Sequence, residues 1–209
     1  MITPEQISYE LEIQENMTIK DLEDAYKGNI IIWITGSVDS VTKNGTYYGV
    51  LQYQQHKLFF EKELVNTTAN RAMIMGVIDA VKRINRLSRI CVITATSLGF
   101  KNAFKGKGPN AAELMTLFED ISSKKCKLTE VQFLNGAALI KNHIYESYPD
   151  ENRKKQLFQK EENKKEKTKE YYNHWVYQKC VDDVVKILEA NQVSISVIEQ
   201  IKALKENGI

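Results

Sequence analysis

Residues 65–76 read Val-Asn-Thr-Thr-Ala-Asn-Arg-Ala-Met-Ile-Met-Gly, and this stretch joins two different hydrophobic patterns. The segment before it is rich in β-forming residues, whereas after it apolar residues recur every three or four positions as far as Ile84. Thr67 or Thr68 can cap a helix, because a hydroxyl at the N-cap accepts from the free N–H groups of the first turn. We therefore predict that a strand ends here and a long amphipathic helix begins.

Three antiparallel strands are predicted before this junction. Residues 30–34 form a continuous apolar run with β-branched side chains, which is typical of a strand buried on both faces. Asn44-Gly45 is a hairpin turn signal, so residues 46–53 form the second strand, and a turn at residues 54–56 leads into the third, residues 57–65.

Beyond the helix the pattern alternates between helices and strands. Residues 89–94 form a short apolar strand, which should lie parallel to the first because a helix leads into it. The remaining expected elements are a helix at 97–104, a helix from a capping box at 110–113 to residue 122, a strand at 128–133 and a helix at 136–148. The sequence thus predicts an α/β domain with a five-stranded mixed sheet flanked by helices.

The two ends of the chain differ from this central part, so we divide it into residues 1–28, 29–149 and 150–209. Residues 1–24 carry seven acidic residues against Lys20 alone, and they include a short helix capped by Thr18 and Asp21. The rest of the chain is therefore basic, which permits contact with nucleic acid.

The C-terminal part predicts a charged helical extension. Opposite charges recur at three- and four-residue spacing from Arg153 to Glu170, which favours a helix exposed to solvent. Apolar residues at helical spacing then run from Tyr171 to Leu188, and we expect them to pack on the chain's own core or on a second copy. Asn191 is expected to end this helix and Ser196 to begin a last short one.

Composition indicates a protein of the cytoplasm. The three cysteines are far apart and match no disulfide or zinc motif. The first residues are neither basic nor followed by an apolar core, so they do not resemble a signal peptide. The longest apolar run, residues 30–34, is too short to cross a membrane.

Over residues 30–148 the chain resembles the ribonuclease H family. The similarity lies in residues 67–76, in Thr35-Gly36-Ser37 and in the order of the strands and helices. The family carries catalytic carboxylates in an Asp-Gly-Ser, on the long helix and in a Thr-Asp-Ser, where they hold two divalent metals. The corresponding residues in this sequence are Thr35, Met73 and Ala95. Because none of these supplies the anionic oxygens that Mg²⁺ requires, the resemblance implies a catalytically inactive member with no metal and no cofactor.

Few other residues could replace the missing carboxylates. Asp39 shares a strand face with Thr35 by parity, but four residues of strand place it roughly 13 Å away. Asn142, His143 and Glu146 on the last helix of the domain offer one side of a weak metal site, and His143 is expected to be a polar surface residue. A third hypothesis, besides the two classes of function given next, is a nuclease that uses Asp39 or Glu146 as a catalytic carboxylate.

The resemblance also implies a substrate-holding surface. It assigns contacts with a nucleic-acid duplex to a polar group and to a basic loop, namely Thr68, Asn70, Arg71 and Thr96, and Lys101, Lys105 and Lys107. Phosphate contacts of this kind bind without sequence preference. Alternatively, Thr68 and Asn70 are helix caps, and the lysines belong to an ordinary solvated loop.

Two classes of function remain open. In the first, the chain is a catalytically inactive ribonuclease H-like protein that binds an RNA–DNA hybrid or duplex non-specifically. In the second, it is a protein-interaction scaffold without nucleic-acid binding, in which residues 171–205 contact a protein partner or a second copy of the chain.

Overall fold

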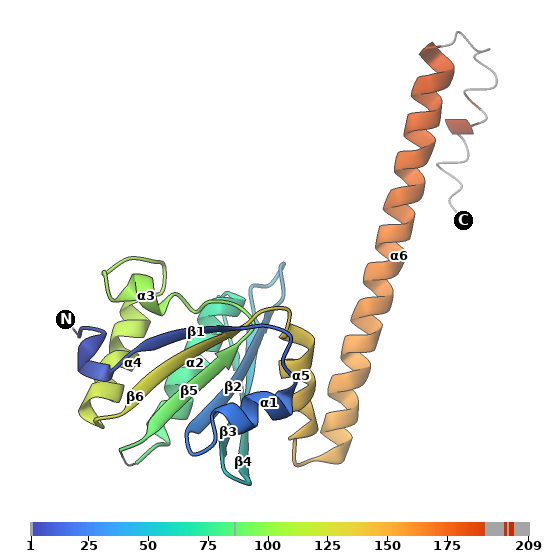
Figure 1. The fold of residues 1–209 in the computed structure, drawn as a ribbon. Helices are drawn as coiled ribbons and strands as arrows, with labels where there is room; N and C mark the ends of the chain where they lie inside the picture. The colour runs from blue at the N-terminus through green and yellow to red at the C-terminus, as the bar shows by residue number, and fades with distance from the viewer. Residues whose placement is uncertain (1, 86, 191–198, 200, 203–209) are drawn as a thin grey trace. The chain divides into compact units, whose positions relative to one another are not determined.

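The computed structural model describes residues 2–85, 87–190, 199 and 201–202. The chain divides into two compact units, Met1–Lys154 and Lys155–Ile209. The first unit holds a six-stranded sheet in the order β1-β6-β5-β2-β3-β4 (Figure 1). The strands are β1 (Glu10–Gln14), β2 (Ile30–Val38), β3 (Gly45–Tyr53), β4 (His56–Leu64), β5 (Arg89–Thr94) and β6 (Lys127–Phe133).

The sheet is mixed, as predicted. β2, β3 and β4 are antiparallel neighbours, whereas β5 is parallel to β2 and β6 is parallel to β5. From β2 to β6 the strands and helices follow the order expected from the sequence, so the α/β, ribonuclease H-like fold is confirmed.

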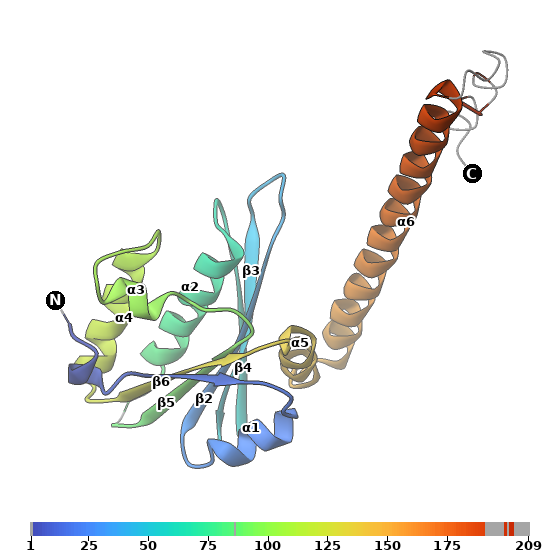
Figure 2. The ribbon, with the colours of Figure 1, turned by 45° about the horizontal axis from the view of Figure 1, so that its top comes forward.

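The expected number of five strands is wrong, because the N-terminal segment adds a sixth. Residues Glu10–Gln14 pair in parallel with β6 and form the outer edge of the sheet (Figure 2). Acidic and apolar residues alternate along this strand, and the Glu12 carboxylate accepts a hydrogen bond of 2.6 Å from the Tyr26 hydroxyl. Glu10 and Glu12 therefore occupy alternate positions of an edge strand.

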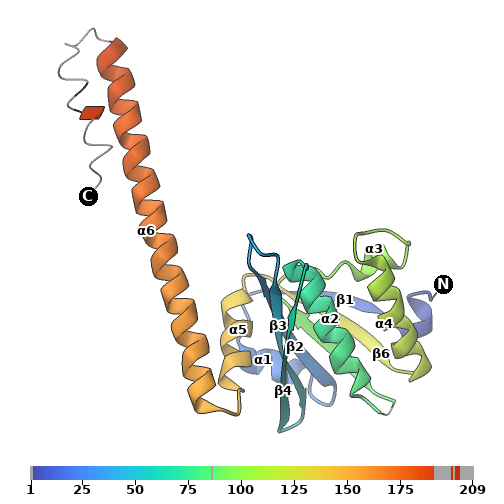
Figure 3. The ribbon, with the colours of Figure 1, turned by 180° about the vertical axis from the view of Figure 1, so that it is seen from behind.

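Helices cover both faces of the sheet. The helices of the described residues are η1 (Glu5–Ile7), α1 (Ile19–Ala25), α2 (Ala69–Lys82), α3 (Phe100–Ala103), α4 (Ala111–Ser123), α5 (Ala137–Glu146) and α6 (Glu151–Ala190), and most of α6 belongs to the second unit. α2 and α4 lie on the face that is nearer the viewer in Figure 3, and α1 and α5 lie on the other. The apolar core between the sheet and α2 and α4 runs from Ile32 on β2 to Phe118 on α4.

Two predicted helix starts have different outcomes. Thr18 and Asp21 form the predicted capping box at the start of α1, with both reciprocal hydrogen bonds present. The capping box expected at residues 110–113 is wrong, because Asn110 makes no side-chain hydrogen bond to the helix. Glu113 instead accepts a hydrogen bond from the Nε of Arg71 on α2 at 3.0 Å, so it connects the first turns of two helices.

α2 approaches the sheet closely at two glycines. A Cβ atom on Gly36 of β2 would lie 2.7 Å from the carbonyl oxygen of Ala69 and 2.9 Å from the Cγ of Met73. A Cβ atom on Gly76 of α2 would lie 2.6 Å from the Cδ1 of Ile34. The backbone of α2 thus packs directly against Gly36, whereas Gly76 packs against the side chains of Ile34 and Tyr47.

The second unit contains most of α6, which confirms the predicted helical extension. Val181 and Val185 are buried there, and Tyr177 and Ile201 pack against them. The predicted helix end at Asn191 and the helix start at Ser196 lie outside the described residues. Among the residues that the structure describes, no helix combines the length and the hydropathy that a membrane crossing needs.

Replacing Gly36 by alanine tests the close approach of α2. We expect Gly36→Ala to lower the free energy of unfolding by about 1–3 kcal/mol, because the new methyl group must displace the backbone of α2. Urea denaturation followed by circular dichroism measures this change. Ser37→Ala, on the opposite face of the same strand, is the matched control, with an expected change within about 0.5 kcal/mol. Equal stability of Gly36→Ala and the wild type would contradict the close packing.

Candidate functional site

Thr35, Met73 and Ala95 correspond to positions that are catalytic in the ribonuclease H family, and two of them lie at one edge of the sheet. Thr35 lies on β2 beyond its last residue pair with β5, and Ala95 is the first residue after β5. Met73, in the second turn of α2, packs over Gly36 and is only 8% exposed. Because parallel strands end at the same edge, Thr35 and Ala95 lie close together along the backbone. Gly36 faces α2 and Met73, whereas Thr35 alternates with Gly36 and lies on the sheet face of Trp33 and α5.

These three positions offer no carboxylate for a metal ion. Within the described residues, no group of three or more His, Cys, Asp or Glu side chains is placed to hold one. Asp39 lies in the turn beyond β2, where its carboxylate accepts hydrogen bonds from the backbone N–H groups of Thr42 and Val41 at 2.8 and 2.9 Å. These bonds lower the pKa of Asp39. Glu146 is exposed at the end of α5.

The polar residues at the α2 start lie in different environments. Thr68 is the N-cap of α2, and its hydroxyl accepts a hydrogen bond from the backbone N–H of Arg71 at 3.1 Å. The Arg71 guanidinium is paired with Glu113, but its side chain remains 45% exposed. The Oδ1 of Asn70 is buried and has no hydrogen-bond partner among the described residues. Thr68 and Arg71 are therefore exposed to solvent, whereas Asn70 is half-buried.

The predicted basic loop follows β5 and is exposed. The carbonyl of Thr96 accepts a hydrogen bond of 2.6 Å from the Thr94 hydroxyl, and the Thr96 side chain is exposed. Lys101 lies on α3, and Lys105 and Lys107 lie in the loop between α3 and α4. This loop leads into the first turn of α4, whose Glu113 contacts Arg71, so Arg71 and the three lysines lie in neighbouring parts of the domain.

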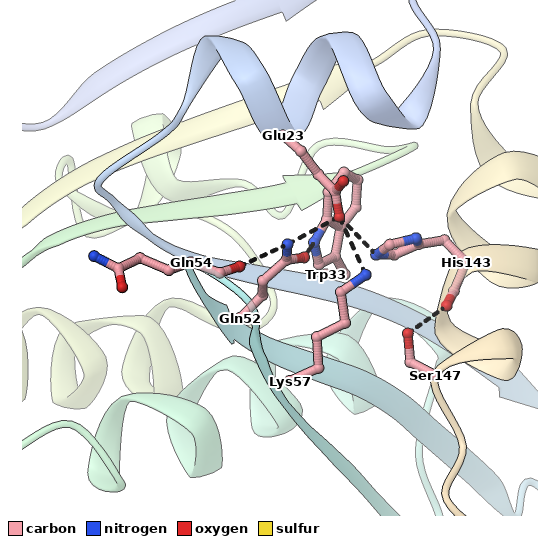
Figure 4. Close-up of polar contacts among 7 residues, drawn as sticks. All are labelled: Glu23, Trp33, Gln52, Gln54, Lys57, His143 and Ser147. Carbon is pink, nitrogen blue, oxygen red and sulfur yellow. Dashed lines mark hydrogen bonds and ion pairs between the residues drawn. The ribbon is translucent and has the colours of Figure 1, made fainter.

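Sequence reasoning missed a partly buried polar cluster on the opposite face of the sheet, beneath α1 and α5 (Figure 4). The Oε1 of Glu23 accepts hydrogen bonds from the Nε2 of Gln52 at 2.9 Å and from the Nζ of Lys57 at 3.2 Å. The Oε1 of Gln52 in turn accepts from the indole N–H of Trp33 at 2.9 Å. We call these residues together with His143 the Glu23 cluster, and they connect α1, the strands β2, β3 and β4, and α5.

His143 is not the polar surface residue that the sequence suggested. It is 7% exposed, and its ring centroid lies 4.6 Å from that of Trp33. Burial, and next the positive charge of Lys57, lower the pKa of His143 to about 4 against the opposing effect of Glu23. The imidazole is therefore neutral at pH 7, and its distance of 3.8 Å from the Glu23 carboxylate is a contact without an ion pair.

Glu23 stays ionised in this cluster. Burial acts to raise its pKa, but the hydrogen bonds from Gln52 and Lys57 outweigh burial and lower the pKa overall. The cluster thus contains one paired carboxylate, one ammonium group and one neutral imidazole. It offers no activated nucleophile, and its evident role is to fix α1 and α5 on the sheet.

Comparisons with known proteins bear on the fold alone. No protein-family model matches the sequence, and no curated protein matches it. Among solved structures, the chain is similar to the crystal structure of RNase H1 from the halophilic archaeon Halobacterium salinarum NRC-1. The two are 12% identical, the match covers 51% of this chain and 86% of that chain, and the TM-score is 0.39. The assignment of the fold rests on the order and direction of the strands.

The Glu23 cluster makes the stability of the domain depend on pH. Since the pKa of His143 is about 4 in the folded protein and about 6.5 in the unfolded chain, the unfolded chain binds more protons between these values. We expect a stabilisation of about 3 kcal/mol that is complete above pH 6.5 and lost as the pH falls to 4. Urea denaturation at pH 7, 6 and 5 measures it.

His143→Phe should flatten this dependence, since phenylalanine fills the same space beside Trp33 and does not titrate. His56→Gln is the matched control, because His56 is exposed and its replacement should leave the pH dependence unchanged. Identical slopes for the wild type and His143→Phe between pH 7 and 5 would show that His143 is not held neutral.

Proposed function

We propose that this chain is a ribonuclease H-like protein that binds a nucleic-acid duplex without cleaving it. The observation that supports the proposal is the chemistry of the three corresponding positions: Thr35 and Ala95 lie at one edge of the sheet, and Met73 packs over Gly36. Two-metal cleavage of a phosphodiester needs several anionic oxygen ligands, and these three side chains supply none.

The binding half of the proposal rests on the cations near that edge. Lys101, Lys105 and Lys107 are exposed on α3 and the following loop, and Arg71 is nearly half exposed at the start of α2. Ammonium and guanidinium groups of this kind contact phosphates without reading the base sequence. Thr68 caps the start of α2, on which Asn70 and Arg71 stand, and the hydroxyl of Thr96 completes the proposed surface.

Binding is tested by fluorescence anisotropy with a labelled RNA–DNA hybrid. We expect saturable binding that weakens with salt, and about ten-fold or more weaker binding after Lys101→Gln/Lys105→Gln/Lys107→Gln, because the glutamines no longer neutralise phosphates. The slope of log K against log salt should become shallower by about 0.9 for each phosphate that the variant leaves without a cation. The label should remain intact in Mg²⁺ and in Mn²⁺.

Lys20→Gln/Lys62→Gln/Lys160→Gln is the matched control, since it removes the same charge from exposed positions elsewhere in the chain. If both triple variants weaken hybrid binding equally, the binding depends on the net charge of the protein and not on the proposed surface. Cleavage of the hybrid that disappears after Asp39→Asn or Glu146→Gln would instead support the third hypothesis, a nuclease with relocated carboxylates.

A specific feature of α6 favours protein assembly as a second candidate function. Tyr171, Tyr172 and Trp175 are 73%, 61% and 49% exposed, and we call them the aromatic patch. The rings of Tyr172 and Trp175 lie 6.2 Å apart, and the Nζ of Lys179 lies 5.3 Å from the Trp175 ring centroid. Grouped exposed aromatic side chains are typical of protein interfaces.

Sedimentation velocity on the full chain tests this second candidate. We expect self-association at micromolar concentration that Tyr171→Gln/Tyr172→Gln/Trp175→Gln abolishes, because the variant lacks the apolar area that an interface buries. Lys167→Gln, an exposed position on the same helix, should leave the association unchanged. Sedimentation of the wild type as a monomer at all concentrations would remove self-assembly through the aromatic patch.

A further inference from the structure

A hollow of about 590 Å³ opens at the edge of the sheet opposite to the one that holds Thr35 and Ala95. It lies where β2, β5 and β6 begin, because these parallel strands start at the same edge (Figure 2). We call it the basic hollow, since its lining includes four basic residues, Lys27, Arg89, Lys125 and Lys127. Among the described residues of this lining, none is acidic.

Hydrogen-bonded turns hold the backbone around the basic hollow. In the turn after α4, the backbone N–H of Lys125 donates to the carbonyl of Ser122 at 2.9 Å. The N–H of Lys127 donates to the carbonyl of Ser88 at 3.0 Å, which joins the starts of β5 and β6. Gly28, with a φ of +88°, turns the chain just before β2. The basic side chains therefore stand on ordered backbone at fixed positions around the hollow.

Two of these positive charges face each other across neighbouring strands. Arg89 and Lys127 are direct partners in the parallel register of β5 and β6, and both are exposed. Like charges at directly opposed positions repel each other and destabilise a sheet. In the described part of the chain, the ion pairs of the domain involve other basic residues, such as Lys57 and Arg71. An anion bound between Arg89 and Lys127 would relieve their repulsion.

Carboxylates lie on the other side of the Arg89 and Lys127 pair. Arg89 and Lys127 also line a second hollow, of about 550 Å³, together with Glu10 and Glu12 of β1. The Glu12 carboxylate already accepts the hydroxyl of Tyr26 at 2.6 Å. Neither glutamate lines the basic hollow, so the positive charge on that side is available to a ligand.

The size and the lining of the basic hollow together define the class of ligand. Its volume lies in the range of about 300–1,000 Å³ that is usual for small-molecule sites. Besides the cations, Ile30, Tyr53 and Leu87 give it an apolar wall, and Asn29 adds an amide. A guanidinium group beside ammonium groups matches the geometry and charge of phosphate.

We propose that the basic hollow binds a nucleoside triphosphate or a ligand of the same kind, with its phosphates between Arg89, Lys125 and Lys127 and its base against the apolar wall. The basic hollow is separate from the proposed duplex-binding surface, and ATP binding in the hollow does not depend on duplex binding. Phosphates of a single-stranded nucleic acid share the same chemistry, so the test includes both sources.

Isothermal titration calorimetry of the full chain with ATP tests the proposal. We expect one ATP bound per chain, weaker binding of inorganic phosphate and no binding of adenosine. Arg89→Gln/Lys127→Gln should bind ATP about ten-fold or more weakly, because two charge-assisted hydrogen bonds to phosphate are removed. In the absence of ATP this variant should be at least as stable as the wild type, since the repulsion between the two charges is removed.

Lys101→Gln/Lys105→Gln is the matched control, because it removes equal charge from the opposite part of the domain. This double variant should leave ATP binding unchanged, although Lys101 and Lys105 are two of the three lysines whose replacement is expected to weaken hybrid binding. Absence of ATP binding, equal weakening in both double variants, or binding of oligothymidylate without ATP would each overturn the proposal. None of these outcomes alters the hybrid-binding test, so the two sites fail or succeed separately.

Discussion

The domain depends on the close approach of α2 to β2. At Gly36 and Gly76 the helix and the strand come so near that a methyl group on either would meet a neighbouring atom at less than 3.0 Å. This contact places Ile34 and Tyr47 beneath α2 and continues into the main apolar core. It also sets Met73 directly over Gly36, where its thioether is packed and only 8% of the residue is exposed.

Much of the fold could be predicted because its local signals agree. The apolar run that begins at Ile30, the Asn44-Gly45 turn and the cap at Thr68 each lead to an observed element. The edge strand β1 was missed, since five residues with three polar side chains resemble an acidic tail when no partner strand is visible. Its pairing with β6 is a contact between distant parts of the chain, which periodicity does not reveal.

The candidate site was less accessible from sequence than the fold. The positions Thr35, Met73 and Ala95 follow from comparison with a motif, and the strand order places Thr35 and Ala95 at one edge. The engagement of Arg71 by Glu113 was missed because Glu113 had a local explanation as part of a capping box. His143 looked like a surface residue on a helix, but Trp33 and Glu23 on distant elements surround it, and only the tertiary structure shows this.

The central claim is that a ribonuclease H-like fold persists here without its metal site. Titration of the ¹⁵N-labelled protein with Mn²⁺, followed by amide line widths, tests it directly, because a bound paramagnetic ion broadens the signals of nearby residues. We predict that the amide signals of Thr35, Met73 and Ala95 broaden no more than those of surface residues far from this edge. Selective, saturable broadening of these three signals would contradict the claim and show that a divalent metal is held there.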